Sequence, residues 1–118
     1  MSTMHKSAVA HIGAPPAVTW EAVTVRLWPN WAAAGFHGPA RDDQQMRFSM
    51  HHGSGAGRSE WTLLVTPAGG GRSVINCEWV TYDVGWLAAA ALGKKSERSL
   101  NDVAQTIRQV AEEMAATR

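Results

Sequence analysis

The stretch SERSLNDVAQTIRQVAEEM, from Ser96 to Met114, carries the clearest periodic pattern in the sequence. Its apolar residues recur at steps of three and four, which predicts one face of an amphipathic helix. They are Leu100, Val103, Ala104, Ile107, Val110, Ala111 and Met114. Ser96 or Ser99 can cap the start, where backbone N–H groups lack partners. Because the rest of the chain supplies strands, we expect this face to pack on a sheet rather than on a partner chain.

Composition narrows the class of protein. A length of 118 residues suits one domain, and an apolar content of 45% argues against disorder. The net charge is +1 without a basic stripe, so we expect no nucleic-acid partner. The single cysteine, Cys77, cannot form an internal disulfide, which fits a reducing compartment such as the cytoplasm. We expect Cys77 to be a buried, inert thiol.

Signals for secretion or membrane insertion are not found in the sequence. Met1 to Ser7 is polar and lacks the apolar core of a signal peptide, and we expect residues 1–6 to be disordered. The longest apolar run, Trp86 to Leu92, is too short to cross a bilayer. We therefore expect no membrane span.

The first third of the chain predicts a strand followed by helix. Ser7 to Ile12 is typical of a short strand, which the Gly-Ala-Pro-Pro sequence at 13–16 ends. Ala17 to Val25 predicts a helix with Trp20 on its flank and with Val18, Ala22 and Val25 buried. Pro29 ends this helix, because a residue before proline is disfavoured in helical space. Residues 31–34 predict one more helical turn, closed by Gly35.

The middle of the chain predicts a loop and then three strands. Residues 32–45 are rich in Gly, Pro, Asp and Gln, which favours a loop. Residues 46–52 alternate between apolar and polar and predict a strand, followed by a flexible turn at 53–57. Two further strands are predicted at 59–66 and 72–84, with a turn at 67–71.

Three motifs in the right order resemble the START-like, or Bet v 1-like, superfamily, polyketide cyclase/dehydratase type. AHIGAPPAVTWEAVT at 10–24, followed by WPNW at 28–31, resembles its opening strand, Val-Trp helix and Trp-Pro-x-Trp turn. WTLLVTP at 61–67 and GGGRSV at 69–74 resemble its late hairpin. GWL at 85–87 resembles its entry into the last helix.

This resemblance implies an α+β helix-grip fold, an antiparallel sheet wrapped around a long C-terminal helix, with residues 1–118 as a single domain. Only residues 32–60 stand where the family usually places several strands. We therefore expect fewer strands than usual and a shorter or more open groove. Open sheet edges are usually covered, so we also expect a homodimer.

The resemblance places Val65 and Val74 in the groove, and alternation along each strand extends the assignment. Pairing His52 with Ser59 places Phe48 opposite Leu63 and Met50 opposite Trp61, all on the same face of the sheet. The predicted ligand-binding residues are Phe48, Met50, Trp61, Leu63, Val65, Asn76, Val80 and Ile107. A slip of one residue on the last strand reverses its faces, so that Ile75, Cys77 and Trp79 face the helix instead. In the first register these three form an exposed apolar stripe, which again favours a dimer.

Three polar residues of this groove are candidate catalytic groups. Glu78 in apolar surroundings would have a raised pKa and serve as a general acid or base. His52 titrates near neutrality and suits proton transfer, and Tyr82 suits donation to a ligand carbonyl. The alternatives are a solvated Glu78, a surface His52 and a core tyrosine with its hydroxyl at the rim. His51 and His52 are adjacent on a strand and point to opposite faces, so we predict no metal site.

For function, the resemblance implies a protein that binds a small hydrophobic molecule between the sheet and the C-terminal helix. The first hypothesis is a polyketide cyclase/dehydratase-like enzyme of secondary metabolism that uses acid–base catalysis without a cofactor. The alternative is a non-catalytic carrier, sensor or sequestering protein. A protein–protein module is a third possibility, because the shortened sheet leaves less room for a cavity.

Overall fold

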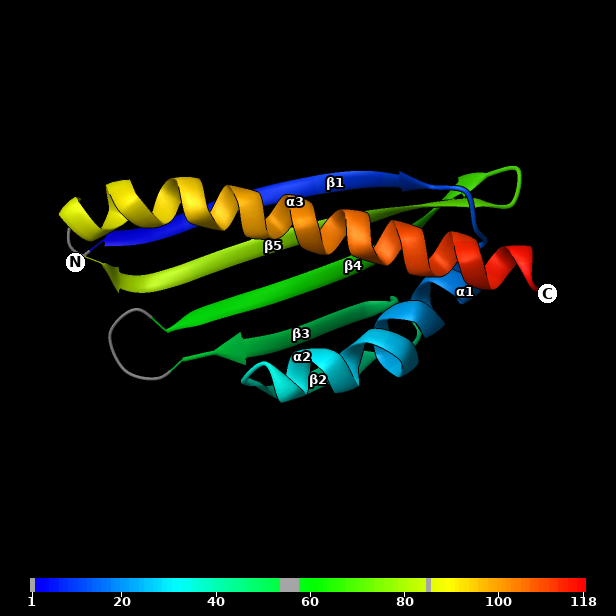
Figure 1. Ribbon diagram of the computed structural model, residues 1–118, viewed down its shortest axis with the longest axis horizontal. Helices are drawn as coiled ribbons and strands as arrows, with labels where there is room; N and C mark the ends of the chain where they lie inside the picture. The colour runs from blue at the N-terminus through cyan, green and yellow to red at the C-terminus, as the bar shows by residue number, and fades with distance from the viewer. Residues whose placement is uncertain (1, 54–57, 85) are drawn as a thin grey trace.

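A five-stranded antiparallel sheet with helices on one face forms the fold (Figure 1). The computed structural model describes residues 2–53, 58–84 and 86–118, with side chains at 3–53, 58–82 and 97–118. The strand order is β1-β5-β4-β3-β2, and the strands are β1 Ser2–Ile12, β2 Phe36–Asp42, β3 Arg47–His52, β4 Ser59–Gly69 and β5 Arg72–Val84. The helical elements are α1 Pro16–Glu21, the π-helical η1 Ala22–Leu27, α2 Trp28–Ala33 and α3 Trp86–Ala116.

The long helix α3 lies along β1 and β5, as the periodic stretch predicts. Its buried residues are Leu100, Ala104, Ile107, Ala111 and Met114, and Val103 and Val110 lie half-buried beside them. The expected cap is wrong, because α3 begins at Trp86 and Ser96 and Ser99 lie inside it. The alanine-rich segment at 88–91 has high helix propensity, which explains the earlier start.

The pairing of β3 with β4 is as predicted, with His52 opposite Ser59, Met50 opposite Trp61 and Phe48 opposite Leu63. The preferred face of β5 is wrong. Val65 stands opposite Ile75, and residues directly opposite each other share a face of the sheet. Ile75, Cys77 and Trp79 are therefore buried under the helices. The expected exposed stripe does not form, so it no longer supports a dimer.

An irregular pairing beside the β4–β5 turn explains this register. The expected turn at 67–71 is shorter, because β4 runs on to Gly69 and pairs with Arg72. Gly70 and Gly71 have φ angles of 61° and 73°, as a two-residue hairpin turn requires. With regular pairing from that turn, Val65 would stand opposite Asn76. The register shift between Pro67 and Gly69 adds one residue, so Val65 stands opposite Ile75 instead.

Both ends of the sheet extend further than expected. β1 begins at Ser2, so residues 2–6, expected to be disordered, pair with β5. Residues 36–42, expected to be loop, form the edge strand β2. Pro39 lies in the irregular pairing between His37 and Ala40, where an edge strand tolerates a missing N–H. β2 is exposed apart from Phe36, so it shows no alternation. Most of the expected turn at 53–57 lies outside the described residues.

Residues 16–33 form one continuous helical stretch instead of two helices. The π-helical segment η1 has a wider turn, which changes the face that each following side chain occupies. Val18 and Ala22 are buried as expected, but Val25 is 55% exposed while Val23 and Leu27 point inward. Trp20, expected on the flank, is also buried. Pro29 stands in the first turn of α2, where its missing N–H is tolerated.

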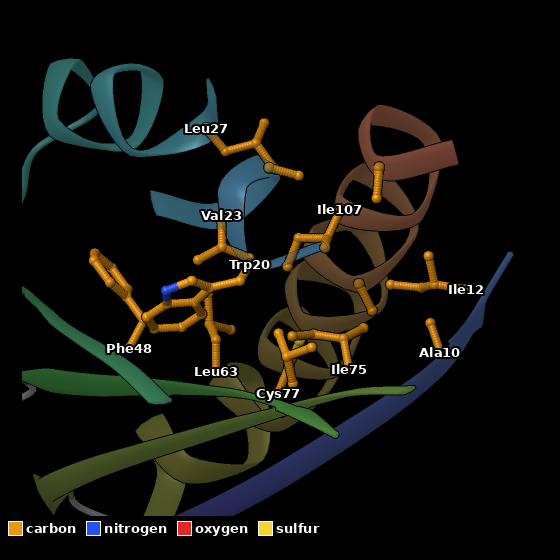
Figure 2. Close-up of a cluster of buried hydrophobic side chains, with 14 of the residues drawn as sticks. Ala10, Ile12, Trp20, Val23, Leu27, Phe48, Leu63, Ile75, Cys77 and Ile107 are labelled. Carbon is orange, nitrogen blue, oxygen red and sulfur yellow. The ribbon is translucent and has the colours of Figure 1, made fainter. Parts of the chain in front are cut away.

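One hydrophobic core lies between the sheet and both helical segments, residues 16–33 and α3 (Figure 2). Trp20, Val23 and Leu27 lie over Phe48 and Leu63. On the other side Ile107 of α3 lies over Ile75, next to Ala10 and Ile12 of β1. Among the described residues, no helix is long and apolar enough to cross a membrane.

Candidate functional site

Six of the predicted ligand-binding residues do share the inner face of the sheet or face it from α3. They are Phe48, Met50, Trp61, Leu63, Val65 and Ile107, each at most 6% exposed. Met50, Leu63 and Ile107 have no accessible surface at all. A side chain lining even a water-sized cavity would retain some, so these three residues fill the core directly.

The other predicted residues lie on the outer face, which corrects their expected place in the groove. Asn76 and exposed Glu78 line a shallow depression of about 460 Å³ with Arg47 and Thr62. Val80 is half-buried opposite Glu60, and Tyr82 is 36% exposed under the Arg58 guanidinium, 6.0 Å from its ring centre. An exposed carboxylate lacks the apolar surroundings on which the acid–base role of Glu78 depended.

His52 lies on the inner side, where ring contacts form two groups: Phe36 with His52 and Trp61, and Trp28 with Phe48. We call these five residues together the aromatic cluster. The ring of Phe36 is 4.9 Å from that of His52 and 5.4 Å from that of Trp61, and Trp28 is 5.6 Å from Phe48. A Cβ on Gly35 would come within 3.4 Å of Nε2 of His52, so this imidazole lies against the end of α2. Phe48 and Trp61 are buried, Trp28 and Phe36 are half-buried, and His52 is exposed.

Two buried hydroxyl groups adjoin the aromatic cluster. Ser59 and Thr81 are direct partners on β4 and β5. Ser59 Oγ donates to the carbonyl of His52 at 3.3 Å and accepts from Nε1 of Trp61 at 3.2 Å. Thr81 Oγ1 donates to the carbonyl of Arg58 at 3.0 Å. Both hydroxyl groups are buried and hydrogen-bonded within the protein, so they connect neighbouring strands beside the aromatic cluster.

Sequence reasoning assigned no role to Trp28, Phe36, Ser59 or Thr81. Trp28 belongs to the WPNW motif, and Phe36 lies in the segment whose composition predicts a loop. Ser59 continues the alternation of Trp61 and Leu63, so the pattern in β4 indicates that it faces inward. The preferred register places Thr81 on the outer face of β5 and therefore gives it no role.

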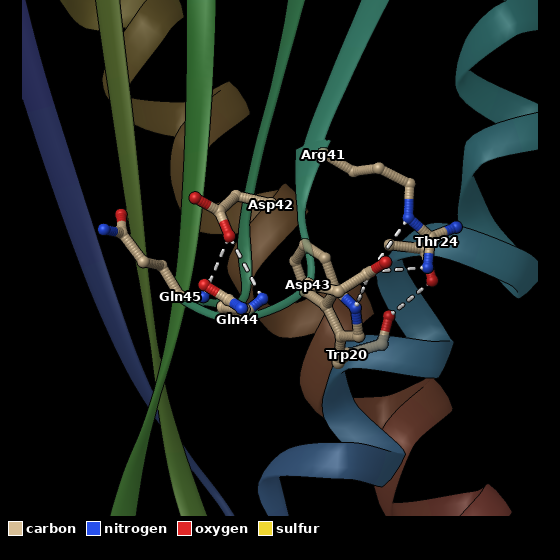
Figure 3. Close-up of polar contacts among 7 residues, drawn as sticks. All are labelled: Trp20, Thr24, Arg41, Asp42, Asp43, Gln44 and Gln45. Carbon is tan, nitrogen blue, oxygen red and sulfur yellow. Dashed lines mark hydrogen bonds and ion pairs between the residues drawn. The ribbon is translucent and has the colours of Figure 1, made fainter.

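A polar contact fixes the helical stretch over the β2–β3 hairpin (Figure 3). Trp20 Nε1 donates to Oδ1 of Asp43 at 2.9 Å, and Arg41 donates to the same oxygen at 2.7 Å and 3.0 Å. The hydrogen bond from Arg41, and then that from Trp20, hold the pKa of Asp43 below its ordinary value. Asp42 accepts from the backbone N–H groups of Gln44 and Gln45, which closes the turn.

Other polar and sulfur-containing side chains in the interior contact only the protein itself. Thr19 and Ser73 share a buried hydrogen bond of 2.7 Å, and Ser73 Oγ also donates to the carbonyl of Ala14 at 2.9 Å. Burial raises the pKa of the Cys77 thiol to about 12, as expected for an inert thiol. No group of three or more metal-binding side chains occurs in the part of the chain that the structure describes.

Comparison with known proteins places this arrangement in a fold class. No family model matches the sequence, and no curated protein matches it. A point mutant of norcoclaurine synthase from Thalictrum flavum, in complex with a transition-state analogue, superposes with a TM-score of 0.73 at 12% identity, over 96% of each chain. A START superfamily protein from Mycobacterium smegmatis gives 0.69 at 11% identity, over 93% of this chain and 98% of the other.

A third similar structure is BexL, the di-domain ARO/CYC protein of the BE-7585A biosynthetic pathway. It gives a TM-score of 0.69 at 12% identity over 95% of this chain, which spans 47% of that larger one. The protein therefore has a START-like, or Bet v 1-like, helix-grip fold. Its neighbours in structure include an ARO/CYC protein and a synthase.

Proposed function

We propose that the protein binds a small hydrophobic molecule on the inner side of the sheet, at the aromatic cluster. The observation that carries this proposal is the contrast within that inner side. Phe36 and Trp28 keep partly exposed rings, whereas Leu63, Met50 and Ile107 are closed off completely. Half-buried aromatic residues beside the exposed imidazole of His52 suit a mostly apolar ligand with one or two polar atoms.

Binding of 1-anilinonaphthalene-8-sulfonate, followed by its fluorescence, tests the site. Phe36→Ala should weaken binding about tenfold, because it removes a ring that contributes roughly 1.5 kcal/mol of apolar contact. Tyr82→Ala is the matched control, since it removes a ring of similar size from the outer face and should leave binding unchanged. Equal losses in both variants, or no binding by the wild-type protein, would contradict the proposal.

The second candidate function is a cyclase/dehydratase-like reaction on the bound molecule. It is favoured by the imidazole of His52, the one predicted catalytic group that lies against the aromatic cluster. His52→Ala should abolish turnover of any ligand that native mass spectrometry finds retained, while binding persists. Glu78→Gln on the outer face should leave turnover unchanged. Loss of turnover in Glu78→Gln with full activity in His52→Ala would reject this assignment.

Two further expectations stay predictions. The homodimer rested on the apolar stripe, which is buried, and on the open sheet edges, which remain. β1 and β2 are the edge strands, and β1 keeps a regular register from Met4 to Ile12. The cytoplasmic location rests on the single cysteine alone.

A further inference from the structure

A cleft of about 530 Å³ opens at the other end of the sheet from Ser59 and Thr81. It lies where the end of β1, the β4–β5 hairpin and the C-terminal half of α3 meet, at the right of Figure 1. Along β4, Ser59 and Gly69 are about 33 Å apart in extended chain. The cleft is therefore separate from the aromatic cluster, and nothing proposed above uses it.

Two arginines from different elements are among the residues that line this cleft. They are Arg72 of β5 and Arg108 of α3. His11 of β1 also belongs to the lining, but it is exposed between buried Ala10 and Ile12 and so points to the outer face. Among the described lining residues, Glu112 is the one carboxylate. Arg72 forms no ion pair or hydrogen bond that involves its guanidinium within the described part of the chain. The cleft therefore carries an excess of positive charge.

Glu112 is already held by the protein. Its Oε2 accepts from the backbone N–H of Gly13 at 2.8 Å and from Nε of Arg108 at 3.3 Å. A Cβ on Gly13 would lie 3.3 Å from that oxygen, so glycine at this position permits the close approach. The hydrogen bond from Gly13, followed by Arg108, lowers the pKa of Glu112. This contact engages Arg108 through Nε and leaves its two terminal nitrogens without a partner among the described residues.

We propose that this cleft binds the phosphate group of a small molecule. Guanidinium groups donate two parallel hydrogen bonds to oxyanions, and they do so best where the anion is partly shielded from water. Guanidinium donors that come from two separate elements fit the tetrahedral oxygens of a phosphate better than the planar oxygens of a carboxylate. Glu112 opposes the anion electrostatically and so limits the affinity of the site.

Titration with inorganic phosphate at constant ionic strength tests the proposal, followed by the backbone amide NMR signals of Gly13 and Ser73. Arg72→Ala should weaken binding about tenfold, because it removes a charge-assisted donor. Glu112→Gln should tighten binding several-fold, since the amide oxygen can still accept from Gly13 while the negative charge is gone. Arg26→Ala removes an exposed arginine of η1 and should change nothing.

Arg72→Ala should weaken phosphate binding, whereas Glu112→Gln should tighten it. This opposite effect distinguishes a specific site from general electrostatic attraction. Equal weakening by Arg72→Ala and Arg26→Ala, or no tightening by Glu112→Gln, would overturn the proposal. Acetate binding as strongly as phosphate at the same ionic strength would overturn the assignment to a phosphate. Unchanged amide spectra outside the cleft show that each variant has kept its fold.

Discussion

The two halves of the inner face of the sheet are covered in different ways. Under α3, Leu100, Ile107 and Ile75 are fully buried in a regular interface of helix on strand. At α2 the cover is looser. Trp28 and Trp31 of α2 and Phe36 of β2 remain half-buried, and every residue of α2 is at least partly exposed. The α3 half is therefore the more tightly closed part of the inner face, and the α2 half is the more exposed part.

Ile107→Ala should cause the largest loss of stability, because it opens a cavity beneath α3. The expected cost is about 2–5 kcal/mol in the free energy of unfolding, measured by urea denaturation. Trp31→Ala, in α2, removes a larger but half-exposed side chain and should cost less. Equal costs for the two variants would end the distinction between the halves.

Cys77 reports directly on how tightly the α3 half is closed. With a pKa of about 12, roughly one thiol in 10⁴ is ionised at pH 8, and the sulfur is buried as well. Native protein should therefore react with Ellman's reagent only as fast as it opens, whereas denatured protein reacts at once. Ile107→Ala should speed the native reaction. Complete labelling of the native wild-type protein within seconds would show that this half is open.

The smallest expected effect concerns the contact that holds the α2 half in place. The pKa of Asp43 is lowered on folding, so its ionised form contributes stability at neutral pH. That contribution is present above the unfolded value of 3.8 and is lost as the pH falls below it through the depressed folded value. Asp43→Asn should be less stable than the wild-type protein near pH 6.

Urea denaturation at a pH well below 3.8 completes this test. As the falling pH protonates the carboxyl group of Asp43 in the folded protein, the difference from Asp43→Asn should shrink. Glu60→Gln on the outer face of β4 is a control for the loss of one carboxylate. A stability difference between the wild-type protein and Asp43→Asn that stays the same at both pH values would mean that the charge of Asp43 is irrelevant.

The buried face of α3 and the pairing of β3 with β4 could be predicted from local patterns. The three-and-four spacing around Ile107 identifies the buried face of the helix, and alternation in β3 and β4 identifies Phe48, Met50, Trp61 and Leu63 as neighbours. The α2 half was harder to predict. β2 is an edge strand with almost no buried side chain, and η1 has a wider turn than the helical period assumes.

The sequence by itself determined the amphipathic helix, the β3–β4 register and the order of the motifs, because each depends on residues close together in the chain. Only the tertiary structure decided which face of β5 is buried. Both faces of that strand carry apolar residues, and the register shift between Pro67 and Gly69, beside the two-residue turn, selects between them. The candidate sites depend on the same kind of decision, since Trp28, Phe36 and Trp61, like Arg72 and Arg108, come from separate elements that meet only after folding.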